Sequence, residues 1–118
     1  MKAVVYEKYA PNDDYNSILK VNEVDDPKPK PNEVVFRVKA TALNYNDIWG
    51  MRGQPIPVPL PHISGSDAAG EVIAVGGDVT SVKVGDRVVS HSNMSCRVCQ
   101  ACTDGREYDC IKRTIWGF

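Results

Sequence analysis

Four cysteines in the last quarter of the sequence are the residues whose type and spacing most clearly predict chemistry. They are separated by two, two and seven residues, and the set comprises Cys96, Cys99, Cys102 and Cys110. A loop with these gaps can wrap four thiolates around one tetrahedral ion, with Zn–S distances of about 2.3 Å. Protein sulfur then fills all four positions, so no water remains to be activated. The spacing therefore predicts a structural zinc site, within a lobe spanning residues 92–112, rather than a catalytic one.

Two other states of the four cysteines stay open. Three cysteines at this spacing also begin the bacterial ferredoxin motif, in which the fourth follows after three residues and precedes a proline. Here Cys110 follows after seven residues and precedes Ile111, which favours zinc over an iron–sulfur cluster. Free or disulfide-linked thiols are the second alternative. Closely spaced cysteines in a reducing compartment bind a metal more often than they form disulfides.

Composition excludes several classes of function. The 118 residues are 42% apolar and 25% charged, with a net charge of -1, as in an ordinary globular protein that can bury a core. Nothing in the charge pattern indicates a nucleic-acid partner or a membrane surface. The apolar run that ends at Tyr6 is too short for a signal peptide, and no later run could span a bilayer. We therefore expect a cytoplasmic protein.

The segments that must position these residues are short and rich in β-branched side chains. Strands are predicted over residues 2–7, 18–24, 34–42, 68–75 and 87–90. Turn-forming residues separate them, beginning with the stretch at residues 11–14. Short strands at this spacing predict a mainly β fold, either a small barrel or a sandwich.

Two local predictions concern the central strand and the helix after it. Every second residue from Val34 to Ala42 lies on one face of a regular strand, and we expect this apolar face to be core. Beyond the strand, Asn46 or Asp47 is expected to cap a short helix that ends near Gly53.

Four stretches, taken together, resemble a known family. They are residues 38–47 (VKATALNYND), 65–72 (GSDAAGEV), 75–89 (VGGDVTSVKVGDRVV) and the cysteine lobe at 91–110. The chain resembles the N-terminal, GroES-like catalytic domain of the medium-chain dehydrogenase/reductase superfamily, which includes zinc-type alcohol dehydrogenases and quinone or enoyl reductases. The resemblance covers nearly the whole chain. It implies a partly open β-barrel that carries a four-cysteine zinc lobe.

The sequence departs from this pattern where alcohol dehydrogenases of the family hold their catalytic zinc. Those enzymes use a cysteine soon after the long central strand and the histidine of a Gly-His-Glu motif. The matching positions here are Asn44 and Ser66, and an amide and a neutral hydroxyl are weak zinc ligands. Only Asp67 remains as a zinc donor. These forms resemble the zinc-independent quinone oxidoreductases and the crotonyl-CoA-type reductases, although quinone oxidoreductases generally lack a cysteine lobe.

The resemblance implies that the full-length enzyme uses NAD(P)H to reduce an enone, quinone or enoyl thioester without a catalytic zinc. Hydrogen-bond donors would then stabilise the enolate oxygen in place of a metal. Asn44 and Tyr45 are the candidate donors, Asn44 is also the candidate cofactor contact, and Asp67 completes the candidate catalytic residues. A purely structural alternative is that Asn44, Asn46 and Asp47 are turn and capping residues after the strand, and that Ser66 and Asp67 form a hydrogen-bonded pair in a loop.

The expected domain organisation follows from the same resemblance. Residues 1–118 are expected to be the N-terminal part of the GroES-like domain, truncated before the Rossmann domain, because strand–helix alternation and a glycine-rich phosphate loop are missing. This part should not bind NAD(P)H and should be inactive alone. We expect a small-molecule substrate and a homo-oligomer at full length. Two alternatives are a zinc-dependent alcohol dehydrogenase domain and a stand-alone zinc-binding barrel that acts as an interaction module.

Overall fold

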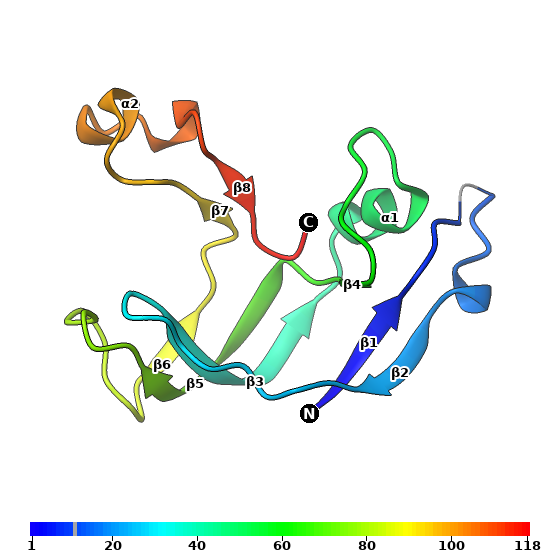
Figure 1. The fold of residues 1–118 in the computed structure, drawn as a ribbon, viewed down its shortest axis with the longest axis horizontal. Coiled ribbons are helices and arrows are strands. Elements are labelled where there is room, and N and C mark those ends of the chain that lie inside the picture. Colours follow the sequence, from blue (N-terminus) through cyan, green and yellow to red (C-terminus); the bar gives the residue numbers. More distant parts are fainter. Residues whose placement is uncertain (11) are drawn as a thin grey trace.

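The computed structural model describes residues 1–10 and 12–118, and Figure 1 follows the chain through them. Pro11, the first residue of the predicted turn at residues 11–14, lies outside the described residues. The elements in chain order are β1 (Lys2–Tyr6), η1 (Tyr15–Ser17), β2 (Lys20–Glu23), β3 (Val34–Ala42), α1 (Tyr45–Arg52), β4 (His62–Ile63), β5 (Asp67–Val75), β6 (Arg87–Val89), β7 (Asn93–Met94), α2 (Gln100–Thr103), η2 (Glu107–Asp109) and β8 (Thr114–Ile115). The fold is mainly β, as the sequence predicts. Among the helices that the structure describes, none has the length and apolar character needed to cross a membrane.

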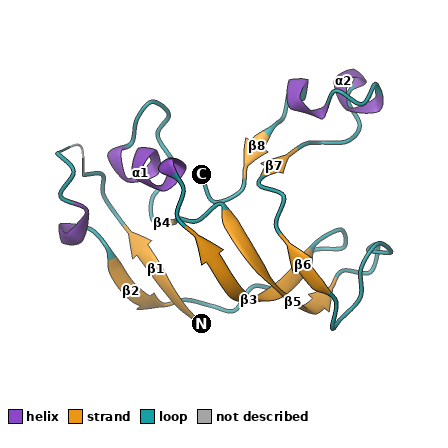
Figure 2. Ribbon diagram, turned by 180° about the vertical axis from the view of Figure 1, so that it is seen from behind, coloured by secondary structure: helices purple, strands orange, loops and turns teal. Residues whose placement is uncertain are grey.

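The strands pair antiparallel and form three sheets. β1 lies between β2 and β4, β5 lies between β3 and β6, and β7 pairs with β8. Figure 2 shows the two three-stranded sheets next to each other, with the β7–β8 pair extending away from them toward α2. Within the described residues, hydrogen-bonded pairing does not join the sheet of β1 to that of β3, so the barrel is partly open, as predicted.

The second predicted strand, at residues 18–24, is shorter in the structure. The turn of 3₁₀ helix η1 precedes β2, and the backbone N–H groups of Ile18 and Leu19 both donate to the carbonyl oxygen of Tyr15 at 3.1 Å. Ile18 is only 3% exposed. Its apolar side chain therefore fills the core instead of extending the strand, and β2 begins at Lys20.

The predicted core face of the central strand is wrong. β3 has the predicted bounds, but Val38 is 52% exposed and both Ala40 and Ala42 are exposed. Only the first three residues of β3 are partly buried. The apolar residues at every second position therefore do not form one buried face.

A β-bulge at Lys39 also breaks the expected alternation of β3. Val38 pairs with Gly70, whereas Ala40 pairs with the preceding residue of β5, Ala69. Neighbouring residues of a strand point to opposite faces, so Val38 and Ala40 also point to opposite faces of the sheet. An extra residue in one strand reverses the alternation beyond it, and a two-residue pattern in the sequence does not reveal where that happens.

The core lies between β1, η1 and α1 instead. Its buried members are Tyr6, Ala10, Ile18, Met51 and Val58. On β5, Val72 is fully buried and Ala68 is 6% exposed. Because α1 packs on β1 through this core, the first turn of α1 has a fixed place beside the end of β3.

Candidate functional site

Asn44 is the N-cap of α1, so the prediction that Asn46 or Asp47 caps this helix is wrong by two or three residues. Asn44 has an extended backbone, and its side-chain oxygen accepts a hydrogen bond from the backbone N–H of Asn46 at 3.2 Å. The Oδ2 atom of Asp47 in turn accepts from the backbone N–H of Asn44 at 2.8 Å. This reciprocal arrangement is a capping box, which satisfies backbone donors that the helix itself cannot pair.

Asp47 is a buried carboxylate that the sequence did not identify as part of the site. It is 7% exposed, and its second oxygen, Oδ1, accepts a hydrogen bond from the Ser64 hydroxyl at 2.7 Å. The Asn44-x-x-Asp47 spacing is a local signal for the capping box. The bond to Ser64 has no such signal, because it joins residues that are 17 positions apart.

The structure brings Asn44 and Asp67 together. The Nδ2 group of Asn44 donates to Oδ2 of Asp67 at 3.4 Å, and the Thr41 hydroxyl donates to the Asp67 carbonyl oxygen at 2.6 Å. Ala42 is paired with Asp67 in the sheet, so the end of β3 and the start of β5 carry these side chains to the same place.

Tyr45 faces a different environment. Its hydroxyl accepts a hydrogen bond from Arg52 at 3.4 Å, and its ring packs edge-on against Trp49 with centroids 5.3 Å apart. The side chain is more than half exposed. Within residues 1–10 and 12–118, no hydrogen bond joins Tyr45 to the side chain of Asn44 or Asp67, so its catalytic role stays a prediction.

The family resemblance aligns Asn44 and Ser66 with the ligands of a catalytic zinc. The Oδ1 atom of Asn44 is already the capping acceptor, and Ser66 is 1% exposed with a hydroxyl that lacks a partner among the described residues. Thiolate and imidazole are the strong zinc donors, and neither occurs at these positions. Of the part of the chain that the structure describes, only the four cysteines form a group of three or more His, Cys, Asp or Glu side chains that could hold a metal.

The four cysteines converge on one point, as predicted. Their Sγ atoms all lie within 4.8 Å of one another, with 3.5 Å between Cys99 and Cys102 and 4.0 Å between Cys96 and Cys102. Four sulfurs at 2.3 Å from a tetrahedral zinc are about 3.8 Å apart, so the cluster fits one ion. The thiols are not joined in disulfides. Cys110 is buried, and its sulfur accepts from the backbone N–H groups of Cys96 and Lys112, both at 3.3 Å.

Residues 30–118 match the family described as the alcohol dehydrogenase GroES-like domain. The chain belongs to this family. The medium-chain alcohol dehydrogenases and reductases of the same superfamily are its relatives, as the sequence motifs implied.

Three relatives illustrate the similarity. The alcohol dehydrogenase of Schizosaccharomyces pombe is 37% identical over 102 residues, which cover 85% of this chain and 29% of the relative. The acryloyl-coenzyme A reductase of Metallosphaera sedula is 34% identical over 113 residues, which cover 96% and 32%. A crystal structure of an NAD-dependent alcohol dehydrogenase matches with a TM-score of 0.89 at 39% identity, over 99% of this chain and 33% of that one. The chain spans about a third of the length of these relatives.

The thiols in the lobe of this GroES-like domain have unequal affinities for protons. Backbone N–H groups, chiefly that of Cys102, lower the pKa of Cys99 to about 6, and those of Val98 and Cys99 lower the pKa of Cys96. Burial, together with hydrogen bonds to Cys99 and Cys110, raises the pKa of Cys102 to about 11. A bound divalent cation would favour the thiolate at every ligand, because metal ligation deprotonates a coordinating thiol.

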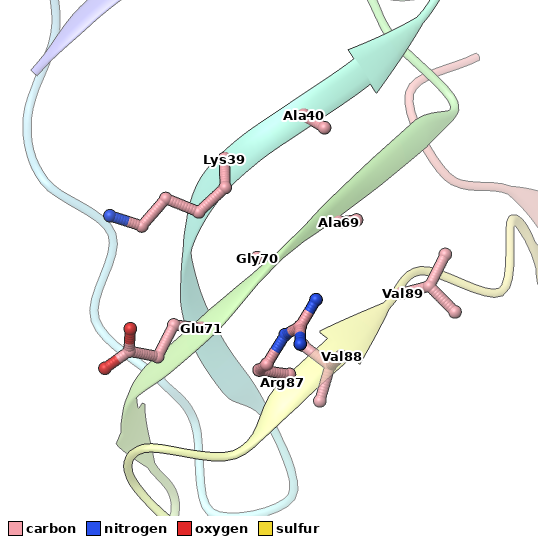
Figure 3. A pocket seen from close by; sticks show the side chains of 8 residues that line it. All are labelled: Lys39, Ala40, Ala69, Gly70, Glu71, Arg87, Val88 and Val89. Carbon is pink, nitrogen blue, oxygen red and sulfur yellow. The ribbon is translucent and has the colours of Figure 1, made fainter.

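Beside Asp67, the GroES-like domain has an open face on β3, β5 and β6. A depression of about 230 Å³ next to Asp67 is lined mainly by apolar side chains, including Ala40, Ala69 and Val89. These three residues also line a larger depression of about 540 Å³, which Figure 3 shows from close by. The charged residues that line the larger depression are Lys39, Glu71 and Arg87. The surface beside Asp67 is therefore apolar, and charge lies farther along the sheet.

Proposed function

We propose that this domain forms the substrate side of an NAD(P)-dependent medium-chain oxidoreductase that reduces an enone, quinone or enoyl thioester without a catalytic zinc. The observation that carries the proposal is the donor set around Asp67. Asn44 and Ser66 stand where a zinc-dependent enzyme needs strong ligands, and the Asn44 side chain is bound to its own helix and to Asp67. The similarity to an acryloyl-coenzyme A reductase supports the choice of substrate class.

The Asn44 amide can supply a hydrogen bond to a developing negative charge. Its NH₂ group has two N–H donors. One of them points to Asp67, and within residues 1–10 and 12–118 the other has no acceptor. Addition of a hydride to the β-carbon of an enoyl thioester moves an electron pair onto the thioester oxygen and forms an enolate, which a preorganised N–H donor stabilises. Bound NAD(P)H would supply the hydride, and a proton added at the α-carbon completes the saturated product.

The lobe has a different task in this proposal. Four thiolates around one zinc leave no open coordination position, so the metal orders residues 96–110 and does not touch the substrate. The peptide between the ligands is polar and has no core of its own. We therefore assign the zinc a structural role only.

Metal analysis tests the proposal directly. Protein purified without added metal should contain one zinc per chain and show no visible absorption. About two zincs per chain would place a second metal at Asp67, overturn the zinc-free mechanism and favour a zinc-dependent alcohol dehydrogenase. Iron with visible absorption would overturn the zinc assignment at the lobe.

An activity assay on the intact enzyme is a second test. NAD(P)H should be consumed in the presence of an enoyl thioester, a quinone or an enone. Alcohol oxidation that a chelator abolishes would contradict the proposal.

Replacing Asn44 by alanine in the intact enzyme should lower kcat about 100-fold, the usual effect of removing one donor to an oxyanion. The change also removes the helix cap, which costs about 1 kcal/mol of stability. Asn44→Ser separates the two effects, since its hydroxyl can still cap α1 but cannot reach the substrate as the longer amide does. We expect Asn44→Ser to lose activity and keep most of the stability. Tyr45→Phe tests the second predicted hydrogen-bond donor. If Asn44→Ala, Asn44→Ser and Tyr45→Phe all keep wild-type turnover, neither Asn44 nor Tyr45 has the proposed catalytic role.

A further inference from the structure

The chain that leaves the zinc lobe returns directly onto the candidate site. β7 and β8 pair as the two strands of a stalk below the lobe, and the backbone N–H of Trp116 donates to the Ser92 carbonyl oxygen at 2.8 Å. Residues 116–118, which we call the strap, follow β8. Figure 1 shows this red segment passing beside the green chain between β4 and β5.

The strap touches the backbone just before Asp67 at very short range. A Cβ atom added to Gly117 would lie 2.0 Å from the Gly65 carbonyl oxygen and 3.2 Å from the Ser66 backbone nitrogen. No side chain fits in that space. Gly117 also has a φ of +77°, in the left-handed region that favours glycine. Both observations require glycine at position 117.

Three further contacts hold the strap in place. The Nε2 atom of His62 lies 3.1 Å from the Gly117 carbonyl oxygen, and because a carbonyl only accepts, Nε2 carries the proton of this hydrogen bond. The Trp116 ring lies 6.3 Å from the Phe36 ring, centroid to centroid. Phe118 packs against the buried core cluster.

We infer that the strap couples the zinc lobe to the candidate site, with Gly117 and His62 as positioning residues that hold the backbone leading to Asp67. One end of the strap continues from the stalk of the lobe, and its middle packs on Gly65 and Ser66. Metal binding orders small polar lobes that lack a core, so a zinc held by the four cysteines would fix one anchor of the strap. The importance of this coupling for turnover rests on the proposed function, but the coupling itself does not.

Nuclear magnetic resonance on the zinc-loaded chain tests the coupling without an activity assay. Removal of zinc by a chelator should shift the backbone amide signals of Ser66 and Asp67 and the indole signal of Trp116. The amide signal of Val21 on β2, far from the strap in sequence and sheet, serves as a reference and should stay in place. Unchanged Ser66 and Asp67 signals, with altered signals from the four cysteines, would overturn the inference.

Substitution of Gly117 provides the second test, with Gly85 as the matched control. Both glycines have positive φ, but nothing lies within 4 Å of a Cβ added to Gly85. Gly117→Ala in the zinc-loaded chain should therefore displace the Ser66 and Asp67 signals, and Gly85→Ala should not. Coupling is reciprocal, so Gly117→Ala should also weaken zinc binding by about fivefold relative to Gly85→Ala. Equal signals and equal zinc affinity in the two variants would contradict the coupling.

His62 keeps the inference testable if Gly117→Ala does not fold. His62→Ala removes the bond to the Gly117 carbonyl without adding any atom, and it should shift the same Ser66 and Asp67 signals. His62→Gln retains an N–H donor of similar reach and should restore them. A shift in His62→Ala that His62→Gln does not reverse would assign His62 a packing role and overturn its role as a positioning residue. These signals do not depend on catalysis, so a failure of the proposed reaction is distinguishable from a failure of the coupling.

Discussion

Cys110→Ser is expected to strip the lobe of zinc and to unfold it while the two three-stranded sheets remain. Cys110 is 5% exposed, and two backbone N–H groups donate to its sulfur, so it is the most enclosed of the four ligands. A serine hydroxyl is neutral and a weak zinc ligand. Loss of even an outer partner of a metal ligand costs about 10- to 100-fold in affinity, and loss of a ligand should cost at least about 100-fold.

Zinc content and hydrogen exchange measure this effect. After dialysis against a weak chelator, the wild-type chain should retain one zinc and the Cys110→Ser chain almost none. Amide protection should be lost in residues 93–115 and retained in β1 and β5. Ser95→Ala, a change beside a ligand that removes no thiol, is the matched control and should retain its zinc. Full zinc retention by Cys110→Ser would show that three thiolates suffice and would contradict the four-cysteine site.

Asp47→Ala is expected to lower the free energy of unfolding by about 2 to 3 kcal/mol, because the buried carboxylate accepts hydrogen bonds from Asn44 and Ser64. Both donors would lose their partner inside the protein, and partly buried hydrogen bonds to a charged group contribute about 1.5 to 3 kcal/mol each. For a domain of this size the loss corresponds to a drop in Tm on the order of 10 °C. Asn44 would lose its backbone anchor, so turnover of the intact enzyme should fall as well.

Thermal unfolding of matched variants separates the two bonds of Asp47. Asp47→Asn keeps an oxygen that can accept from the Asn44 backbone, and its NH₂ group can donate to the Ser64 oxygen, so it should lose much less stability than Asp47→Ala. Ser64→Ala removes one bond only. We expect a Tm for Ser64→Ala between those of the wild type and Asp47→Ala. Equal Tm values for Asp47→Ala and Asp47→Asn would show that the hydrogen bonds contribute little to stability.

Asp47→Ala and Cys110→Ser test different structural supports of the contact between Asn44 and Asp67. The capping box fixes the Asn44 side of the Asn44–Asp67 contact, and the strap packs on the residues that precede Asp67. A 3.4 Å hydrogen bond between side chains is weak by itself. Its geometry therefore depends on the backbone segments that carry the two residues, which is why changes outside the pair should affect it.

The sequence by itself determined the features that depend on neighbouring residues. The cysteine spacing predicted a single ion site, because all four ligands lie within fifteen consecutive residues and the loop can close only locally. The positions of β1, β3, β5 and β6 followed from short β-branched runs between turn residues, whereas the short strands β4, β7 and β8 were not predicted. The end of α1 followed from Gly53, whose φ of +68° suits glycine and ends the helix.

Only the tertiary structure decided the features that join distant parts of the chain. The β-bulge at Lys39 broke the expected alternation of β3, because register depends on the partner strand. The bonds from Ser64 to Asp47 and from Asn44 to Asp67 required two elements to meet, and their residues are 17 and 23 positions apart. The place of Gly117 against Gly65 likewise follows from how the stalk of the lobe returns to the sheets. Such contacts form through packing of whole elements, and the local pattern of residue types does not encode them.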